Sequence, residues 1–416
     1  MFLITLSQFI TTTFLIIISM FGLTYYGHDS GPMYIITVLG VNISSVIYIM
    51  NYEIRYHSAA VGSWRPYLLP AVFVMFYFME HVFISSINTE TSASSLRDVI
   101  AVSSLGMWGG TFCYRYNRFG DFAKNMELIM LICTIALVMA LPTMFISSLG
   151  TSIGGSGDHQ IVSYTSAMAF GCSISRYFIN PEEGYWFFKN KLYHYLSLPL
   201  MVLQALICIV GGGRGGFVTL FVIALFSMLA IKRSVKRLFL FGVLGIAGIL
   251  FWGHIVEDSN FGRSFMRIFG MFGKSDVASV DEIRNMVAAT AWSYIIDSPI
   301  WGYGFFHQFD MCMKSVNGPY WHNYFIELLM QGGIILFAIG TSVYFKVIMR
   351  TKRIIQRDSN HFPLITLVSY PFVMLLFSGS YMLTPCFWFA VTYVLGYYRF
   401  YYKLPVDCKN PRNTQQ

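Results

Sequence analysis

Apolar runs of about 20 residues recur along this chain, and each is long enough to cross the hydrocarbon core of a bilayer as a helix. Helices are the expected form because a bilayer offers no partners for unpaired backbone groups. Only 12% of the 416 residues are charged, whereas soluble domains carry about a quarter. The sequence therefore predicts an all-α, polytopic transmembrane helical bundle, with residues 1–416 forming a single integral-membrane domain.

We expect about twelve helices, each placed to within a few residues. The predicted helices cover residues 2–26, 32–52, 66–87, 98–114, 126–148, 161–179, 193–212, 216–231, 238–256, 320–345, 362–383 and 386–401. The first lacks the basic segment and the small-residue cleavage site of a signal peptide, so we expect it to be retained as a membrane helix.

Lysine and arginine set the expected orientation of these helices, because both concentrate on the cytoplasmic side of membrane proteins. If both termini are cytoplasmic, 21 of the 28 basic residues lie on that side. The net charge of +8 is then mostly a topology signal. We therefore expect no nucleic-acid partner.

One segment on the outer side, residues 257–319, is much longer than the other connections, and loops of this length are usually functional. A helix is predicted within it from 281 to 296, after a capping-box pattern formed by Ser279 and Glu282. Ile283, Val287 and Ala291 would share a face, as in an interfacial or docked helix. The sequence thus predicts one large periplasmic loop that contains a helix.

Arg214 stands within a glycine-rich segment, Gly-Gly-Gly-Arg-Gly-Gly at 211–216. Glycines such as Gly213 and Gly215 would let the backbone approach an anion, and the guanidinium would add bidentate donors suited to phosphate. The helix that follows would direct its positive end the same way. A glycine-rich turn with an arginine that reaches to the membrane surface is the alternative.

Three further arginines lie in the long loop. Arg284 would occupy the first turn of the loop helix, either paired with Asp281 or facing the same ligand as Arg214. Arg263 and Arg267 are four residues apart and would share a face if that stretch is helical. They are candidates for contact with lipid phosphate.

His322 opens the tenth predicted helix, beside Asn323 and on the outer side with Arg214 and Arg284. A histidine here can be structural, but it is also the natural group for proton transfer near neutral pH. Glu327 follows within an apolar run, where a carboxylate is costly unless it has partners or lines a polar cavity. Both are candidate site residues.

The remaining polar candidates carry less information. Glu80 and His81 could line the same cavity, or Glu80 could pair with an arginine. Glu257 and Asp258 could bind a divalent ion, but no D-x-D motif or ligand-spaced cluster supports a metal or another cofactor. The seven cysteines form no C-x-x-C pair and are interpreted as small buried hydrophobic residues.

The order of the outer-side motifs resembles the O-antigen polymerase and O-antigen ligase superfamily. An arginine-glycine turn at Arg214 is followed by a long loop with Arg284 and by Asp-Ser-Pro-Ile-Trp-Gly-Tyr-Gly-Phe at 297–305. His322-Asn323 then precedes Gly332-Gly333 by about ten residues. The resemblance covers roughly residues 200–340, and the N-terminal half is similar only in being polytopic.

The resemblance implies an integral-membrane glycosyltransferase with a GT-C-like architecture in the bacterial inner membrane, acting at the periplasmic face in lipopolysaccharide biosynthesis. Its substrate would be an oligosaccharide on undecaprenyl pyrophosphate. Arg214 and Arg284 would bind the pyrophosphate, and His322 would orient or deprotonate the acceptor hydroxyl. Gly213, Gly215, Asn323, Glu327, Arg263 and Arg267 would contact the substrate. Membrane lipids and a chain-length regulator of the inner membrane are the other candidate partners.

Two departures from the family pattern favour a polymerase over a ligase. The residue before Arg214 is Gly213 rather than serine or threonine, and Ile-Ile-Leu follows Gly333 where ligases often place Gly, Thr or Tyr. A ligase that transfers finished glycan to lipid A-core is the second hypothesis. A secondary transporter and a non-enzymatic scaffold are the others, although transporters hold binding charges near the midplane of related halves.

Overall fold

The computed structural model describes residues 1–9, 13, 32–84, 86–146, 158–179, 184–187, 189–211, 213–230, 242, 278–316, 318 and 320–402. At 32–35, 140–146, 158–159 and 278–284 it describes the backbone alone. Within these residues the regular structure is entirely helical, which confirms the predicted all-α class. Predicted helix 238–256, apart from Gly242, and most of predicted helix 2–26 lie outside the described residues.

The helices follow one another in a simple order. They are α2 (Pro32–Tyr56), α3 (Leu69–Phe83), α4 (Thr89–Asp98), α5 (Ser104–Arg115), α6 (Phe119–Ile146), α7 (Asp158–Phe178), α8 (Lys191–Val210), α9 (Arg214–Ala230), α12 (Ala278–Asp297), α13 (His307–Val316), α14 (Tyr324–Arg357), α15 (Leu364–Phe377) and α16 (Pro385–Phe400). A π-helical segment, Val99–Ser103, joins α4 to α5. Residues 2–9 are also mostly helical.

Five helical segments among the described residues are long and apolar enough to cross a membrane: Arg65–Phe83, Phe119–Met139, Lys191–Val210, Tyr324–Arg357 and Ser359–Phe377. The shorter helix α9 is also apolar. Many of their large apolar side chains are exposed on the outside of the bundle, as lipid-facing residues are. The chain is therefore an integral membrane protein.

Several predicted boundaries were wrong for identifiable reasons. The helix predicted at 98–114 begins earlier, because α4 continues through the π-helical segment into α5. The helix predicted at 320–345 extends to Arg357, because a basic amphipathic stretch continues it past the apolar run. The helix predicted at 362–383 ends at Phe377, where Gly379 with a φ of +82° starts a turn.

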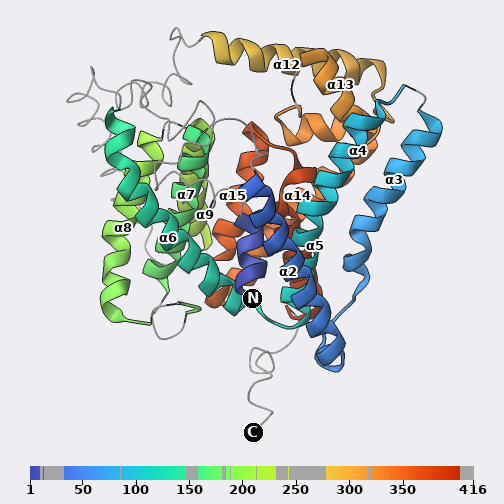
Figure 1. Ribbon diagram of the computed structural model, residues 1–416. Helices are drawn as coiled ribbons and strands as arrows, with labels where there is room; N and C mark the ends of the chain where they lie inside the picture. The colour runs from blue at the N-terminus through green and yellow to red at the C-terminus, as the bar shows by residue number, and fades with distance from the viewer. Residues whose placement is uncertain are drawn as a thin grey trace.

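The long loop contains two helices in its described part. Helix α12 confirms the predicted loop helix, with Val287 and Ala291 on its buried face. Helix α13 was not predicted, because its ten residues carry a mixture of polar and apolar types without a marked start signal. In Figure 1 both helices lie across one end of the bundle; we call this the loop end.

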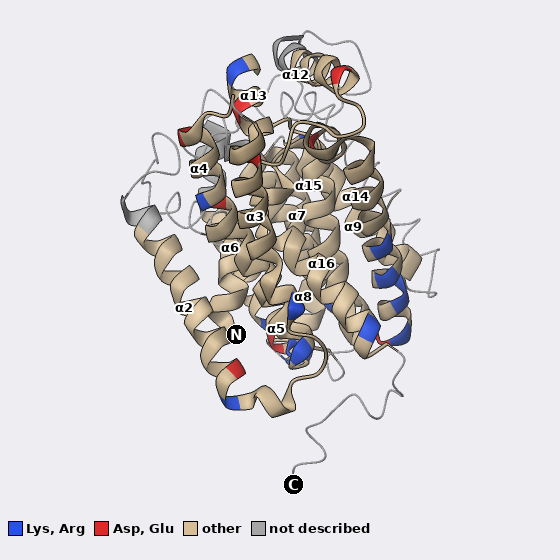
Figure 2. Cartoon of the chain, turned by 90° about the vertical axis from the view of Figure 1, so that its right-hand side faces the viewer, with Lys and Arg blue, Asp and Glu red and all other residues tan. Residues whose placement is uncertain are grey.

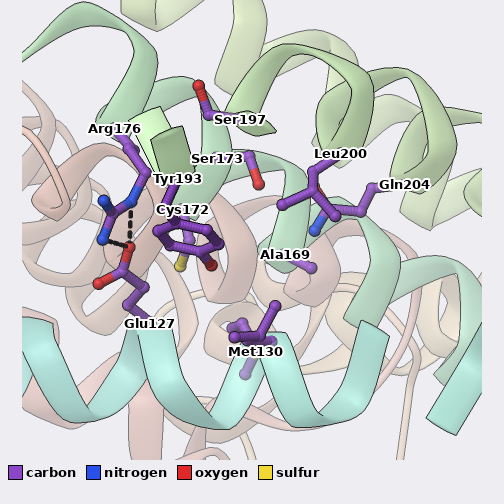
Figure 3. Close-up of a pocket in the computed structure, with 11 residues that line it drawn as sticks. Glu127, Met130, Ala169, Cys172, Ser173, Arg176, Tyr193, Ser197, Leu200 and Gln204 are labelled. Carbon is purple, nitrogen blue, oxygen red and sulfur yellow. Dashed lines mark hydrogen bonds and ion pairs between the residues drawn. The ribbon is translucent and has the colours of Figure 1, made fainter. Parts of the chain in front are cut away.

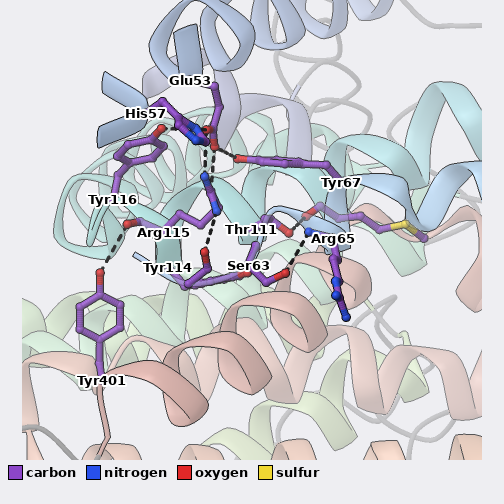
Figure 4. Close-up of polar contacts among 12 residues, drawn as sticks. Glu53, His57, Ser63, Arg65, Tyr67, Thr111, Tyr114, Arg115, Tyr116 and Tyr401 are labelled. Carbon is purple, nitrogen blue, oxygen red and sulfur yellow. Dashed lines mark hydrogen bonds and ion pairs between the residues drawn. The ribbon is translucent and has the colours of Figure 1, made fainter. Parts of the chain in front are cut away.

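Most lysines and arginines drawn in Figure 2 gather at the opposite end, which we call the basic end. The predicted charge asymmetry is therefore present in the fold. Figure 4 shows how a buried arginine is held there: the Nε and Nη2 atoms of Arg115 donate to the two carboxylate oxygens of Glu53 over 2.9 and 3.1 Å. Tyr67 and Tyr116 also donate to this carboxylate. The network ties α2 to α5 and gives Arg115 a structural role.

Candidate functional site

Arg214 is the first residue of α9 and is half-buried. The sequence placed the helix start two residues later, so the guanidinium belongs to the first helical turn rather than to the loop before it. This end of α9 carries the partial positive charge of the helix dipole. Positive charge is thus concentrated where α9 begins.

The glycines around Arg214 let α9 approach α7 closely. A Cβ atom at Gly215 would lie 1.9 Å from the Tyr164 hydroxyl, and one at Gly216 would lie 2.4 Å from the Ser163 Cβ. The Gly213 N–H donates to Ser163 Oγ over 2.8 Å. This amide therefore has a protein partner, whereas the sequence suggested a ligand; the roles of Gly213 and Gly215 in substrate binding stay predictions.

The start of α9 is connected to the end of α15 through α7. The Tyr164 hydroxyl, which fills the space above Gly215, lies 3.5 Å from Ser378 Oγ. Ser378 is the residue directly after α15. The turn after α15 is thus a neighbour of the Arg214 segment.

His322 lies at a sharp corner before α14, with a φ of +57° that few non-glycine residues adopt. The residues on both sides are fixed. Trp321 is buried, and Asn323 caps α14 by accepting hydrogen bonds from the N–H groups of Phe325 and Ile326. The Asn323 amide donates to Leu376 O over 3.3 Å. The corner that carries His322 is therefore held against the end of α15.

Glu327 is almost fully buried one turn into α14. Its carboxylate accepts hydrogen bonds from the Ser380 hydroxyl, the Tyr381 N–H and the Gln331 amide. The Tyr381 hydroxyl donates to Gln331 in turn. These contacts explain how a carboxylate is tolerated in an apolar helix, while the predicted contact of Glu327 with substrate stays a prediction.

The sequence analysis missed these partners of Glu327. Ser380, Tyr381 and Gln331 carry no motif, and the only signal was the buried carboxylate, which required donors somewhere. Tyr164 and Ser378 were missed for the same reason. Their importance depends on which helices are neighbours, and the linear sequence does not state that.

The glycine-containing loop motif at 297–305 contacts the Gly332-Gly333 pair at a kink in α14. Gly332 and Gly333 have non-helical backbone angles there. The kink frees Met330 O and Gln331 O, which accept hydrogen bonds from the N–H groups of Tyr303 and Gly304 over 2.7 and 2.8 Å. Ile334 N–H donates to Pro299 O over 2.8 Å. A Cβ at Gly333 would lie 2.3 Å from the Ile300 carbonyl, so the loop motif and the helix glycines form one packed unit.

The structure therefore brings Arg214 and His322 to the same end of the bundle. The His322 corner contacts the end of α15 directly, and the Arg214 segment is linked to the residue after α15 through Tyr164 of α7. Helix α12, which carries Arg284, lies across this end in Figure 1. The side chain of Arg284 lies outside the described residues. Arg263, Arg267, Glu257 and Asp258 lie outside them altogether, so their predicted roles stay predictions.

Glu80 and His81 have partners that the sequence did not suggest. The Glu80 carboxylate accepts from three backbone N–H groups at the start of α13, and among the described residues no arginine or lysine pairs with it. His81 contacts Tyr77 O and Ser92 Oγ.

Helix α13 carries an ion pair of its own, in which Asp310 binds Lys314 over 2.6 Å. Burial lowers the pKa of His307 at the start of this helix, against the opposing effect of Asp310.

A second polar cluster lies between α6, α7 and α8 (Figure 3). Arg176 pairs with Glu127 and lies over the rings of Trp186 and Tyr193. Ser173, Ser197 and Gln204 line the small cavity beside the pair. The pair has no net charge, and we interpret the cluster as structural.

The six described cysteines are all buried and unpaired, as expected.

Residues 199–341 match a family whose description is O-antigen ligase. The matched segment contains Arg214, Arg284, His322 and the kink glycines, but not Glu80, Tyr164 or Ser378. No curated protein matches the chain.

Proposed function

Because the chain belongs, through residues 199–341, to the O-antigen polymerase and ligase superfamily, we propose that it is a polysaccharide polymerase of the bacterial inner membrane. Its substrates are oligosaccharide repeat units on undecaprenyl pyrophosphate, and the loop end faces the periplasm. The gathering of basic residues at the other end supports this orientation.

The observation that carries the proposal is that the His322 corner contacts the end of α15, to which Tyr164 of α7 also links the Arg214 segment. These segments are about a hundred residues apart, and each supplies one requirement of glycosyl transfer from a diphosphate. Arg214 adds a guanidinium to the positive end of α9, which suits a departing pyrophosphate. His322 supplies a group that can accept a proton near neutral pH.

The reaction follows from these two roles. The acceptor sugar hydroxyl attacks the anomeric carbon of the donor, and a new C–O bond forms as the bond to the pyrophosphate oxygen breaks. The pyrophosphate leaves with the electron pair, stabilised by Arg214 and, by the family resemblance, by Arg284. His322 takes the hydroxyl proton. Asn323 and Glu327 act beside it by holding the start of α14 in place.

A ligase is the second candidate, because the matched family, whose description is O-antigen ligase, does not distinguish the two activities. The residues that favour a polymerase are Gly213 before Arg214 and the Ile-Ile-Leu stretch after Gly333. Both activities use the same leaving group, so the acceptor distinguishes them. A polymerase extends a lipid-linked glycan, whereas a ligase uses lipid A-core.

The test replaces Arg214 with alanine in cells that make the polysaccharide and examines the banding of their lipopolysaccharide. We expect the rate of glycosyl transfer to fall about a hundredfold or more, as it does when a donor that stabilises a developing oxyanion is removed. Arg97→Ala is the matched control, because Arg97 is an exposed arginine that pairs only with exposed Asp98 among the described contacts. Loss of the long ladder with single-repeat product retained supports a polymerase; loss of all capped product identifies a ligase. An unchanged ladder rejects both.

A further inference from the structure

Glu80 lies near the loop end of α3, outside the segment that matches the family, and is 7% exposed. Its Oε1 atom accepts a hydrogen bond from the Phe305 N–H over 2.5 Å. Its Oε2 atom accepts from Phe306 over 2.9 Å and from His307 over 3.1 Å. One carboxylate thus receives three consecutive backbone N–H groups.

These amides lie at the beginning of α13, where a helix leaves N–H groups without internal partners. An anion there is also favoured by the helix dipole, and charge-assisted bonds are stronger than neutral ones. A buried carboxylate in a membrane helix requires such donors. The contact therefore gives the Glu80 carboxylate its hydrogen-bond donors and gives the unpaired N–H groups at the start of α13 an acceptor.

The neighbouring residues are shaped for this contact. Gly304 has a φ of +94°, and a Cβ atom on it would lie 2.7 Å from the Glu80 carboxyl carbon. Phe305 packs on Phe76 with ring centroids 4.6 Å apart, and Phe306 packs on Tyr77 at 5.6 Å. Gly304 leaves room for the Glu80 carboxylate, and the rings of Phe305 and Phe306 pack segment 304–306 against α3.

The same segment is also fixed to α14. Tyr303 and Gly304 donate to the kink carbonyls of α14, and the next three residues donate to Glu80. The segment directly follows α12, the helix that carries Arg284. The position of segment 303–307 therefore determines the positions of α12 and α13 relative to His322 and the start of α14.

We propose that Glu80 is a positioning residue, whose carboxylate clips the external loop to α3 and so holds the loop helices over the site at the start of α14. Its effect on transfer rests on the proposed function, whereas the clip itself does not. The contribution comes from a helix that the family match does not cover.

The test compares Glu80→Gln with Glu90→Gln, a control on the exposed start of α4. Glutamine keeps the shape of Glu80 but carries no charge and has only one good acceptor. Cys312 on α13 is fully buried and reports on the clip. In the purified full chain, maleimide labelling of Cys312, read by peptide mass spectrometry, should rise at least about tenfold in Glu80→Gln, as expected for weakened charge-assisted bonds. Glu90→Gln should label as the wild type does.

Gly304→Ala provides a second variant, because its methyl group would push the segment off Glu80 without changing the carboxylate. It should expose Cys312 as Glu80→Gln does, and the double variant should add little to either change, since both break one contact. In both variants kcat for glycosyl transfer should fall about tenfold, while thermal unfolding of the bundle stays near that of the wild type.

If maleimide labelling of Cys312 stays at the wild-type level in both variants, Glu80 does not hold the loop against α3 and the proposal is wrong. Exposure of Cys312 with an unchanged kcat overturns the positioning role. If Arg214→Ala and His322→Ala retain full transfer while Glu80→Gln exposes Cys312, the proposed function fails and the clip stands.

Discussion

At the scale of single residues, the site combines ordinary side-chain chemistry with an unusual backbone. His322 was singled out for its imidazole, but its φ of +57° is a separate property of the position. Strained residues persist where their neighbours are fixed, and such positions cluster at functional sites. Buried Trp321 and the helix-capping Asn323 hold this corner.

The backbone and the imidazole of His322 can be separated by substitution. Glycine adopts a positive φ without steric cost, whereas alanine does not. We expect His322→Gly to unfold at about the wild-type temperature and His322→Ala to be less stable by about 1 kcal/mol. Both should lose transfer, because neither can accept a proton. Thermal unfolding in detergent and a transfer assay check this, and activity in His322→Gly would refute a chemical role for the imidazole.

At the scale of elements, α14 contributes more than a membrane crossing. Its first turn carries Glu327 and directly follows the His322 corner, and its kink at Gly332 and Gly333 binds the loop. A kink frees backbone groups that would be costly in a membrane unless other groups satisfy them. The loop segment 299–304 supplies those groups, so the kink and the loop motif depend on each other.

Gly333→Ala should therefore disrupt the contact between α14 and the loop. Gly333 has a φ of +56° and a ψ of −154°, a region that only glycine visits freely, and an added Cβ would meet the Ile300 carbonyl. We expect a loss of about 1–3 kcal/mol in stability and a large loss of transfer. Gly40→Ala is the control, because nothing lies within 4 Å of its added Cβ. Equal thermal unfolding of the two variants would contradict this account.

At the scale of the whole molecule, the segment that matches the family is supported by helices outside it. Tyr164 on α7, Ser380 after α15 and Glu80 on α3 all contact residues of the matched segment. Farther from the site, the buried pair of Glu127 and Arg176 joins α6 to α7 (Figure 3). The pair belongs to the scaffold on which α8 and α9 are packed.

The Glu127–Arg176 pair gives a prediction about this scaffold. Arg176→Met would leave the Glu127 carboxylate buried without its cation, which typically costs about 3–5 kcal/mol. The double variant with Glu127→Leu removes both charges, and we expect it to recover most of that stability. Thermal unfolding of the full chain measures both. A double variant less stable than Arg176→Met would show that the pair is needed for more than charge balance.

The sequence alone allowed much of this protein to be predicted, because long apolar runs and the distribution of lysine and arginine are local properties. They predicted the helical membrane class, most helix positions and the loop helix α12. Arg214, Arg284 and His322 were singled out from their local sequence and then from motif order, and the family match covers the segment that carries them. Their chemical roles stay predictions.

Only the tertiary structure decided which groups became neighbours. Residue types predict that Glu80 and Glu327 need donors, but they do not predict that those donors are the start of α13 and the turn after α15. The glycines beside Arg214 looked suited to a ligand, yet they admit the side chains of α7. The physical reason is that burial and hydrogen bonding depend on contacts between helices far apart in the chain, whereas hydrophobic length and charge are recorded residue by residue.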